Sequence, residues 1–250
     1  MVATQLLICD FDWSVVDQDT DRWVAEVLST PIRRKMETEE ELEKADTKQW
    51  TEIVGDALKD LHEQGFTRKQ IENALETIPF HPAMKRGLTL LKTTVKPKTT
   101  FLCLSNANSV YISTVLKAND LGHIYDETIT NPAEWDNAGR LRVHRRIPAD
   151  GPQHGCKVGC KPNMCKGEEL MNFLARHGHE FDRMLYLGDG SNDFCPILRL
   201  RSQDYALVRT GRSLEKRIRQ DGQAMGLTCG VKYWGGAWEV EEIFQQMAEP

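Results

Sequence analysis

Two aspartates separated by one residue stand at the end of the first apolar run of the chain, in the segment CDFDWSVVD. Residues i and i+2 of an extended strand point to the same side, so Asp10 and Asp12 could present both carboxylates to one cavity. Such a pair can attack an electrophile, transfer protons or bind a metal ion. Taken alone, the same letters also fit a polar turn that leaves a strand, because aspartate is a common turn former.

A second pair of aspartates follows another apolar run, RMLYL, in the segment GDGSNDFCP. Gly188 and Gly190 flank Asp189, and glycine allows a tight turn and a close approach of the backbone to a ligand. We therefore regard Gly190 as a candidate for substrate contact. A capped turn before a helix is the alternative, but two glycines with Asp189 and Asp193 beyond an apolar strand favour a site.

Two further polar positions border apolar segments. Ser105 and Asn106 follow the run 101–104, where a hydroxyl and the backbone N–H groups of a helix start would offer donors to an anion. An ordinary helix N-cap explains the same letters. Lys166 opens a helical pattern, and because the helix dipole disfavours a cation at that end, we expect an anion beside it.

Short apolar runs alternate with helical patterns along the chain, which is typical of an α/β fold with a parallel sheet. The strand candidates are 6–9, 101–104, 183–187, 205–208 and, more weakly, 228–232. Ligands of open α/β sheets bind at the carboxyl ends of the strands. The polar residues that follow these runs are therefore expected to meet at one edge of the sheet.

The segment 19–92 differs from the rest because it contains no convincing strand. Residues 37–49 are dense in Glu and Lys, Thr67 could cap a helix, and Pro82 could open the next one. We expect a helical lid over the strand ends. A pair of ordinary crossover helices is the alternative, and the segment is too long for it.

The bulk composition excludes some classes of protein. The 250 residues are 40% hydrophobic and 28% charged, with a net charge of −5, as in an ordinary soluble globular protein. This charge gives no electrostatic reason to expect a nucleic-acid or membrane partner. No signal-peptide pattern or membrane-spanning apolar run occurs. With seven cysteines, an odd number, a reducing cytoplasm fits best.

The order of these features resembles the haloacid dehalogenase (HAD) superfamily of phosphotransferases. The Asp10 segment looks like its first motif, Ser105 its second, Lys166 its third, and Asp189 with Asp193 its fourth. The resemblance covers nearly the whole chain, because the helical insertion falls where that superfamily has its type 1 cap.

The resemblance implies a particular fold and division into domains. We expect a Rossmann-like HAD core with a parallel sheet, formed by residues 1–18 and 93–250. Residues 19–92 would form the helical type 1 cap, inserted after the first strand.

A closer similarity is visible in the segments DFDWSVVDQDTDRW, IPFHPAMKRGLTLL, TNPAEWDNAGRL, PNMCKG and GDGSNDFCP. They are similar to the phosphoethanolamine/phosphocholine phosphatase family, which also includes pyridoxal phosphate phosphatases and related plant and fungal enzymes. The similarity implies Mg²⁺-dependent hydrolysis of a small phosphorylated metabolite.

The resemblance also assigns roles to the catalytic residues. Asp10 attacks phosphorus and forms an aspartyl-phosphate intermediate, since a carboxylate can form an acyl phosphate that water later cleaves. Asp12 protonates the leaving oxygen and then activates water. Ser105 and Lys166 hold the phosphoryl oxygens.

The resemblance further implies that three aspartates supply the oxygens that bind the metal. Mg²⁺ would take oxygens from Asp10, from the backbone carbonyl of Asp12 and from Asp189. Asp193 would support the metal or its waters from a second shell.

Substrate choice depends on acidic residues near the first two motifs. In the cationic-headgroup members of the family, such residues are thought to meet the amine, and the candidates in this chain are Asp17 and Asp21. Helix capping explains both aspartates equally well. Asn106 stands where those relatives have Asp, and an amide cannot supply the negative charge. This departure puts phosphocholine and phosphoethanolamine in doubt and leaves pyridoxal phosphate and thiamine monophosphate open.

A cysteine-rich segment stands apart from these motifs. Cys156, Cys160 and Cys165 lie close together, with His154 just before them, and soft ligands at such spacing could bind a structural Zn²⁺. The spacing is not that of a standard zinc knuckle. A loop held by packing, or a redox-sensitive thiol pair, explains the segment as well.

Other functions are compatible with the same fold. A catalytically silent HAD module for binding or regulation is the main alternative, although all four motif positions carry competent residues. A HAD phosphotransferase would pass the phosphoryl group to a sugar rather than to water. A receiver domain also uses Asp, Ser or Thr, and Lys, but it is about half as long and lacks the insertion.

Overall fold

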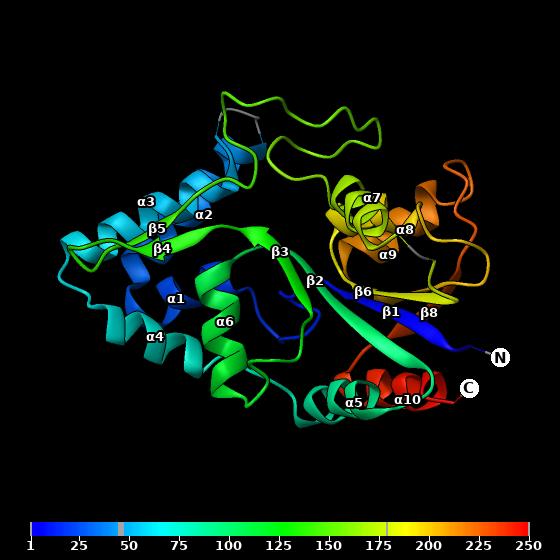
Figure 1. The fold of residues 1–250 in the computed structure, drawn as a ribbon. Coiled ribbons are helices and arrows are strands. Elements are labelled where there is room, and N and C mark those ends of the chain that lie inside the picture. Colours follow the sequence, from blue (N-terminus) through cyan, green and yellow to red (C-terminus); the bar gives the residue numbers. More distant parts are fainter. Residues whose placement is uncertain (1, 45–47, 179, 250) are drawn as a thin grey trace.

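The computed structural model describes residues 2–44, 48–178 and 180–249, and it has an α/β architecture. A six-stranded parallel sheet forms the centre, with helices on both faces (Figure 1). This confirms the fold class expected from the alternating apolar runs. Residues 45–47 of the helical insertion lie outside the described part.

The strand order of the sheet is β3-β2-β1-β6-β7-β8. The strands are β1 (Thr4–Cys9), β2 (Lys98–Asn108), β3 (Glu127–Asn131), β6 (Arg183–Gly188), β7 (Tyr205–Arg209) and β8 (Gly230–Trp234). All five apolar runs lie in or overlap strands. The edge strand β3 was not anticipated, since the sequence ETITN offers only one strongly apolar residue.

Alternate residues of each strand enter two separate hydrophobic cores. Leu6 and Ile8 of β1 pack with α7 (Lys166–His177), whereas Leu7 and Cys9 belong to the core on the opposite face. This alternation follows from the two-residue period of a strand. Helices α8 (Phe194–Ile197) and α9 (Ser213–Asp221) lie with α7 on the first face. Helices α5 (Pro82–Thr93) and α10 (Ala237–Met247) cover the other (Figure 1).

Four helices of the insertion pack together beside the carboxyl ends of the strands (Figure 1). They are α1 (Thr20–Leu28), α2 (Thr30–Lys44), α3 (Trp50–Glu63) and α4 (Arg68–Glu76). Thr67 begins α4 in a capping box with Gln70, as its position predicted. An unexpected antiparallel hairpin, β4 (Ala133–Trp135) and β5 (Leu141–Val143), packs against α3. The helical insertion therefore packs with residues from a second part of the chain.

Helix α5 packs with the core rather than with the other helices of the insertion. Its Gly87 faces α10 so closely that an added Cβ would lie 2.9 Å from Phe244 Cδ2, and Arg86 pairs with Glu241. Pro82 stands in its first turn, as expected. The domain boundary at residue 92 stays a prediction, and these contacts favour one near residue 80.

Helix α6 (Ser109–Ala118) begins later than the sequence suggested. We expected β2 to end at Leu104 and a helix to start beside Ser105, but β2 continues to Asn108. The Asn108 side chain caps the helix by accepting a hydrogen bond from Tyr111 N at 3.0 Å. Ser105 is therefore a strand residue, and the Tyr111 N–H in the first turn of α6 is bound by Asn108.

Among the described residues, we find no helix that is both long enough and apolar enough to cross a lipid bilayer.

Candidate active site

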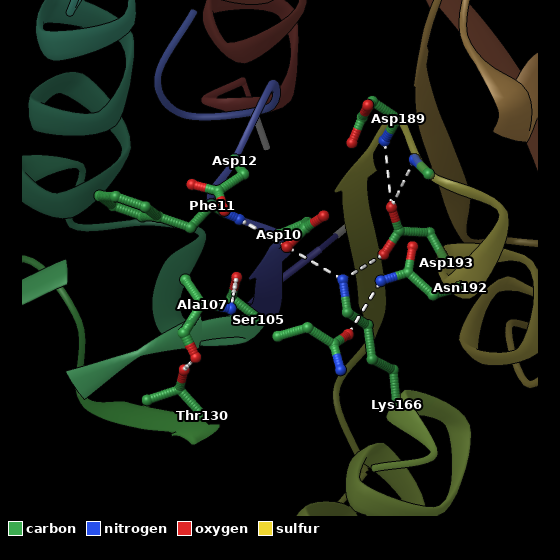
Figure 2. Close-up of polar contacts among 12 residues, drawn as sticks. Asp10, Phe11, Asp12, Ser105, Ala107, Thr130, Lys166, Asp189, Asn192 and Asp193 are labelled. Atoms are coloured by element: carbon green, nitrogen blue, oxygen red, sulfur yellow. Dashed lines mark hydrogen bonds and ion pairs between the residues drawn. The ribbon is translucent and has the colours of Figure 1, made fainter. Parts of the chain in front are cut away.

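The predicted catalytic residues converge at the carboxyl edge of three neighbouring strands (Figure 2). Asp10 directly follows β1, Ser105 lies near the end of β2, and Asp189 directly follows β6. These strands adjoin in the order β2-β1-β6, so residues far apart in sequence meet at one place, as expected for an open α/β sheet.

Lys166 reaches from the first turn of α7 to the carboxylate of Asp10. Its Nζ lies 2.9 Å from Asp10 Oδ1 and 2.7 Å from Asp193 Oδ1, and its side chain is only 1% exposed. The same Asp10 oxygen accepts a hydrogen bond from Phe11 N at 2.7 Å. Burial lowers the pKa of Lys166, but the two carboxylates more than offset this and raise it, so the amine remains charged.

Asp193 is fully buried and both of its oxygens are occupied. Oδ1 accepts from Lys166 and from the Tyr186 hydroxyl at 2.7 Å. Oδ2 accepts from the backbone N–H groups of Asp189 at 3.1 Å and Gly190 at 2.9 Å. Asp193 therefore positions the ammonium group of Lys166 and the turn after β6. A side chain at Gly188 would collide with the Asp193 carboxylate, so glycine leaves room for Asp193.

The carboxylates form a pocket suited to a hard divalent cation. Oxygens of Asp10, Asp189 and Asp193 all lie within 4.8 Å of one another, and all three residues are buried. Because Asp193 is committed to hydrogen bonds, Asp10 and Asp189 are the better candidates for direct ligands. Carboxylate oxygens are the ligands that Mg²⁺ prefers.

The raised pKa values of the carboxyl groups also indicate an excess of negative charge at the site. Burial and the neighbouring Asp193 raise the pKa of Asp10 to about 6, although Lys166 opposes the shift. Burial, followed by Asp10 and Asp193, raises the pKa of Asp189 to about 8. A bound divalent cation would offset this repulsion.

Asp12 is held by the first residue of the cap helix α1. Its Oδ1 accepts from Thr20 N at 3.0 Å and its Oδ2 from the Thr20 hydroxyl at 3.3 Å. Burial raises the pKa of Asp12 well above its usual range, and the carboxylates of Asp19, Asp21 and Asp10 add to the shift. Asp12 is therefore able to carry a proton at higher pH than an ordinary aspartate.

Ser105 and Asn106 face the site from β2. Ser105 Oγ accepts a hydrogen bond from Ala107 N at 3.2 Å (Figure 2). Asn106 Oδ1 accepts from Asn192 Nδ2 at 2.8 Å, and Asn131 Nδ2 donates to the Asn106 carbonyl at 2.6 Å. No sequence signal marks Asn192 and Asn131 as site residues, because single asparagines are common in turns and at strand ends.

A cavity of about 180 Å³ opens above these residues. The core contributes Asp10, Asp12, Trp13, Ser105, Asn106, Ala107, Asp189 and Asn192, and the cap side contributes Asp19, Asp21 and Trp50. Asp19, Trp50, Ala107 and Asn192 were not predicted as site residues. The cavity is bounded by both the sheet edge and the insertion, so a small substrate there would touch both.

The two acidic candidates for substrate contact differ in position. Asp21 lines the cavity and accepts a hydrogen bond from the Trp50 indole N–H at 2.9 Å. Burial and the neighbouring Asp19 raise the pKa of Asp21 to about 7. Asp17 is absent from the described cavity lining, and Arg209 binds its Oδ1 at 2.7 Å.

Gly190, a predicted substrate contact, and Trp13 occupy different positions at the site. Gly190 lies outside the described lining and donates its N–H to Asp193 rather than facing the cavity. Trp13 lines the cavity with a left-handed backbone (φ 57°), and Arg212 stacks on its ring with Cζ 3.6 Å from the centroid. A non-glycine residue in that conformation is strained, which is common where a backbone is fitted to a ligand.

Comparison with known proteins agrees with this geometry. The family model described as Putative Phosphatase matches residues 5–248. Pyridoxal phosphate phosphatase PHOSPHO2 of Bos taurus is 31% identical over 247 residues, covering 96% of this chain and 97% of the relative. Inorganic pyrophosphatase 2 of Arabidopsis thaliana is 30% identical over 246 residues, covering 97% and 83%.

The fold has solved counterparts as well. A HAD family hydrolase from Salmonella enterica serovar Typhi superposes with a TM-score of 0.65 at 11% identity, covering 97% of this chain and 72% of that one. At this identity the likeness concerns the fold, and the fold is the one that the motif order implied.

Proposed function

Because the chain belongs to the family described as Putative Phosphatase, we propose that it hydrolyses a small phosphomonoester through an aspartyl-phosphate intermediate on Asp10. The enzyme class, a phosphoric monoester hydrolase with the HAD fold, is that of its relatives. The observation that carries the mechanism is the buried contact of Asp10 with Lys166, beside Asp189 and at the wall of a cavity.

The first step uses the free oxygen of Asp10. Lys166 and Phe11 N both contact Oδ1, so Oδ2, which takes part in neither contact, is the atom that attacks phosphorus. The bond from phosphorus to the ester oxygen breaks, and its electron pair stays on that oxygen. Asp12 gives the leaving oxygen a proton, a role that its raised pKa supports.

The second step releases phosphate. Asp12, now a carboxylate, takes a proton from water, and the water oxygen attacks phosphorus. The bond to Asp10 breaks and the nucleophile is regenerated. Lys166 and Ser105 offer donors to the phosphoryl oxygens, which carry the growing negative charge.

Mg²⁺ is the cofactor that the donor set fits. Asp10 and Asp189 would hold it, with the backbone carbonyl of Asp12, and Asp193 would fix their surroundings through its bonds to Lys166 and Gly190. When bound, Mg²⁺ supplies positive charge that screens the substrate phosphate from the carboxylates.

The residues of the cavity wall support a choice of substrate class within this proposal. Trp13 and Trp50 offer aromatic surface, and Asp19 and Asp21 make the cap side acidic. This wall favours a phosphate ester of an aromatic alcohol that is neutral or cationic, such as pyridoxal or thiamine. It disfavours pyrophosphate, which carries more negative charge. Asn106 in the lining adds no negative charge for choline or ethanolamine. The cytoplasmic location and the absence of a nucleic-acid partner stay predictions.

The decisive experiment is phosphate release with and without Mg²⁺ from pyridoxal phosphate, thiamine monophosphate, phosphoethanolamine, phosphocholine and pyrophosphate. Asp10→Asn should lower kcat by more than about 10³-fold, because it removes the nucleophile while keeping the shape of the side chain. Asp120→Asn, whose side chain is 88% exposed, is the matched control and should retain activity.

Near-normal turnover of Asp10→Asn would refute the mechanism. If well-folded protein with Mg²⁺ releases phosphate from no compound, a catalytically silent module becomes the better interpretation. Transfer of the phosphoryl group to an added sugar, seen by product analysis, would instead indicate a phosphotransferase.

A further inference from the structure

Four cysteines from three parts of the chain gather behind the catalytic lysine. Cys156 and Cys160 come from the segment between β5 and α7, Cys165 immediately precedes α7, and Cys195 lies in α8. Their four Sγ atoms all lie within 4.8 Å of one another. We propose that this cluster is a tetrathiolate Zn²⁺ site that fixes the cysteine-rich segment and the start of α7 against α8.

The sulfur geometry fits a metal rather than disulfides. Sγ of Cys156 lies 3.6 Å from that of Cys160 and 3.5 Å from that of Cys195, and Sγ of Cys165 also lies 3.5 Å from that of Cys195. Four thiolates at about 2.3 Å from a tetrahedral zinc would stand roughly 3.8 Å apart. A disulfide would bring two sulfurs to about 2.05 Å, and all four cysteines are free.

The ligand set differs from the one suggested by sequence. Cys195 was absent from that set because it lies 30 residues beyond Cys165 in the chain. His154, the neighbouring candidate, is not part of the cluster, and its Nε2 lies 2.7 Å from the Lys161 carbonyl. Only the tertiary fold reveals that the fourth ligand is a thiol.

The cluster has the supporting hydrogen bonds of a metal site. The N–H of Val158 points at Cys156 Sγ and that of Glu168 at Cys165 Sγ, each at 3.4 Å. Donors of this kind spread the negative charge of thiolates and orient them. Cys165 also caps the N-terminus of α7, where the helix dipole favours an anionic sulfur.

The site would explain how a long irregular segment keeps one conformation. Between β5 and α7, residues 144–165 contain no helix or strand, and loops of this length usually need another anchor. Gly167 lies against Cys195 so closely that a Cβ would stand 2.5 Å from its Sγ. The cluster therefore lies where the first turn of α7 packs against α8.

The consequence for the catalytic site is positional. Cys165 is the neighbour of Lys166, and Cys195 follows Asp193 by two residues. A metal that ties these two cysteines together also fixes the backbone on both sides of the buried Lys166–Asp193 pair. The zinc would touch neither substrate nor Mg²⁺ and would act as a positioning group.

The test is the metal content of the full chain after dialysis against metal-free buffer. Wild-type protein should contain a single zinc ion per chain, as measured by inductively coupled plasma mass spectrometry. Cys156→Ser and Cys195→Ser should lose it, whereas Cys229→Ser, a buried cysteine outside the cluster, should keep it. Co²⁺-loaded wild type should show the visible bands of tetrahedral thiolate coordination, a readout that needs no variant to fold.

The proposal is wrong if wild-type protein binds no zinc and shows no tetrahedral thiolate bands with Co²⁺. It is also wrong if Cys195→Ser retains as much zinc as Cys229→Ser. A disulfide within the cluster, in protein isolated without reductant, would overturn it as well. Asp10→Asn should keep its zinc while losing turnover. Failure of the phosphatase mechanism and failure of the zinc site are thus separate outcomes.

Discussion

At the scale of single residues, Lys166 is the side chain on which the site depends most. It is the cation between two buried carboxylates, Asp10 and Asp193, and it has almost no contact with solvent. A buried ion pair contributes little net stability when intact, but removal of one partner leaves an uncompensated charge in a low-dielectric environment.

Lys166→Met should therefore lower the free energy of unfolding by about 3–5 kcal/mol, measured by urea denaturation of metal-free protein at pH 7. Lys85→Met is the matched control, because Lys85 pairs with Asp120 at the surface and should change stability by at most about 1 kcal/mol. Equal effects of the two substitutions would contradict the role given to Lys166.

At the scale of elements, the first turn of helix α7 both supplies a site residue and packs closely against a neighbouring helix. Lys166 faces the carboxylates, while Gly167 packs against α8 with no space for a side chain. The sequence pair Lys-Gly is thus explained by one helix end that must serve the site and approach a neighbour. The helical pattern alone predicted the helix but not the reason for the glycine.

Gly167→Ala should destabilise the protein by about 1–3 kcal/mol, because its Cβ would overlap Cys195. Gly55→Ala in α3 is the contrasting control: its Cβ meets no atom within 4 Å, so the better helix propensity of alanine should add about 0.5–1 kcal/mol. The two variants can be compared by thermal unfolding, and a stabilising Gly167→Ala would disprove the close contact.

At the scale of the whole molecule, the carboxylate cluster couples stability to pH and to metal. In metal-free protein, folding raises the pKa of Asp10 from its ordinary 3.8 to about 6 and that of Asp189 to about 8. The folded state then binds more protons than the unfolded state between these values. Stability from this cluster is consequently greatest at low pH and falls as the pH rises from about 4 to about 8.

Mg²⁺ should reverse that trend, because it binds the deprotonated carboxylates. The rise in Tm on adding Mg²⁺ is expected to be larger at pH 8 than at pH 5.5, as measured by scanning calorimetry. Asp189→Asn removes one of the titrating groups and a proposed ligand, and should shrink both the pH dependence and the Mg²⁺ effect. A Mg²⁺-induced shift that is independent of pH would argue against metal binding at this cluster.

The sequence by itself was enough to find the central strands, the helical nature of the insertion and the polar residues at the strand ends. These features are local: apolar runs of strand length mark buried strands, and Thr67 and Pro82 mark helix starts. The motif order then implied the HAD fold. The match of the family to residues 5–248 bears out that recognition.

The tertiary structure alone decided which residues from distant segments share a site. The cap side of the cavity, with Asp19 and Trp50, and the hairpin β4–β5 against α3 depend on how the insertion packs over the sheet. Cys195 joins the other cysteines only because α8 packs on the start of α7. These contacts depend on long-range packing, which the local spacing of residues does not encode. The fourth thiol and the acidic wall of the cavity can therefore be seen only in the folded chain.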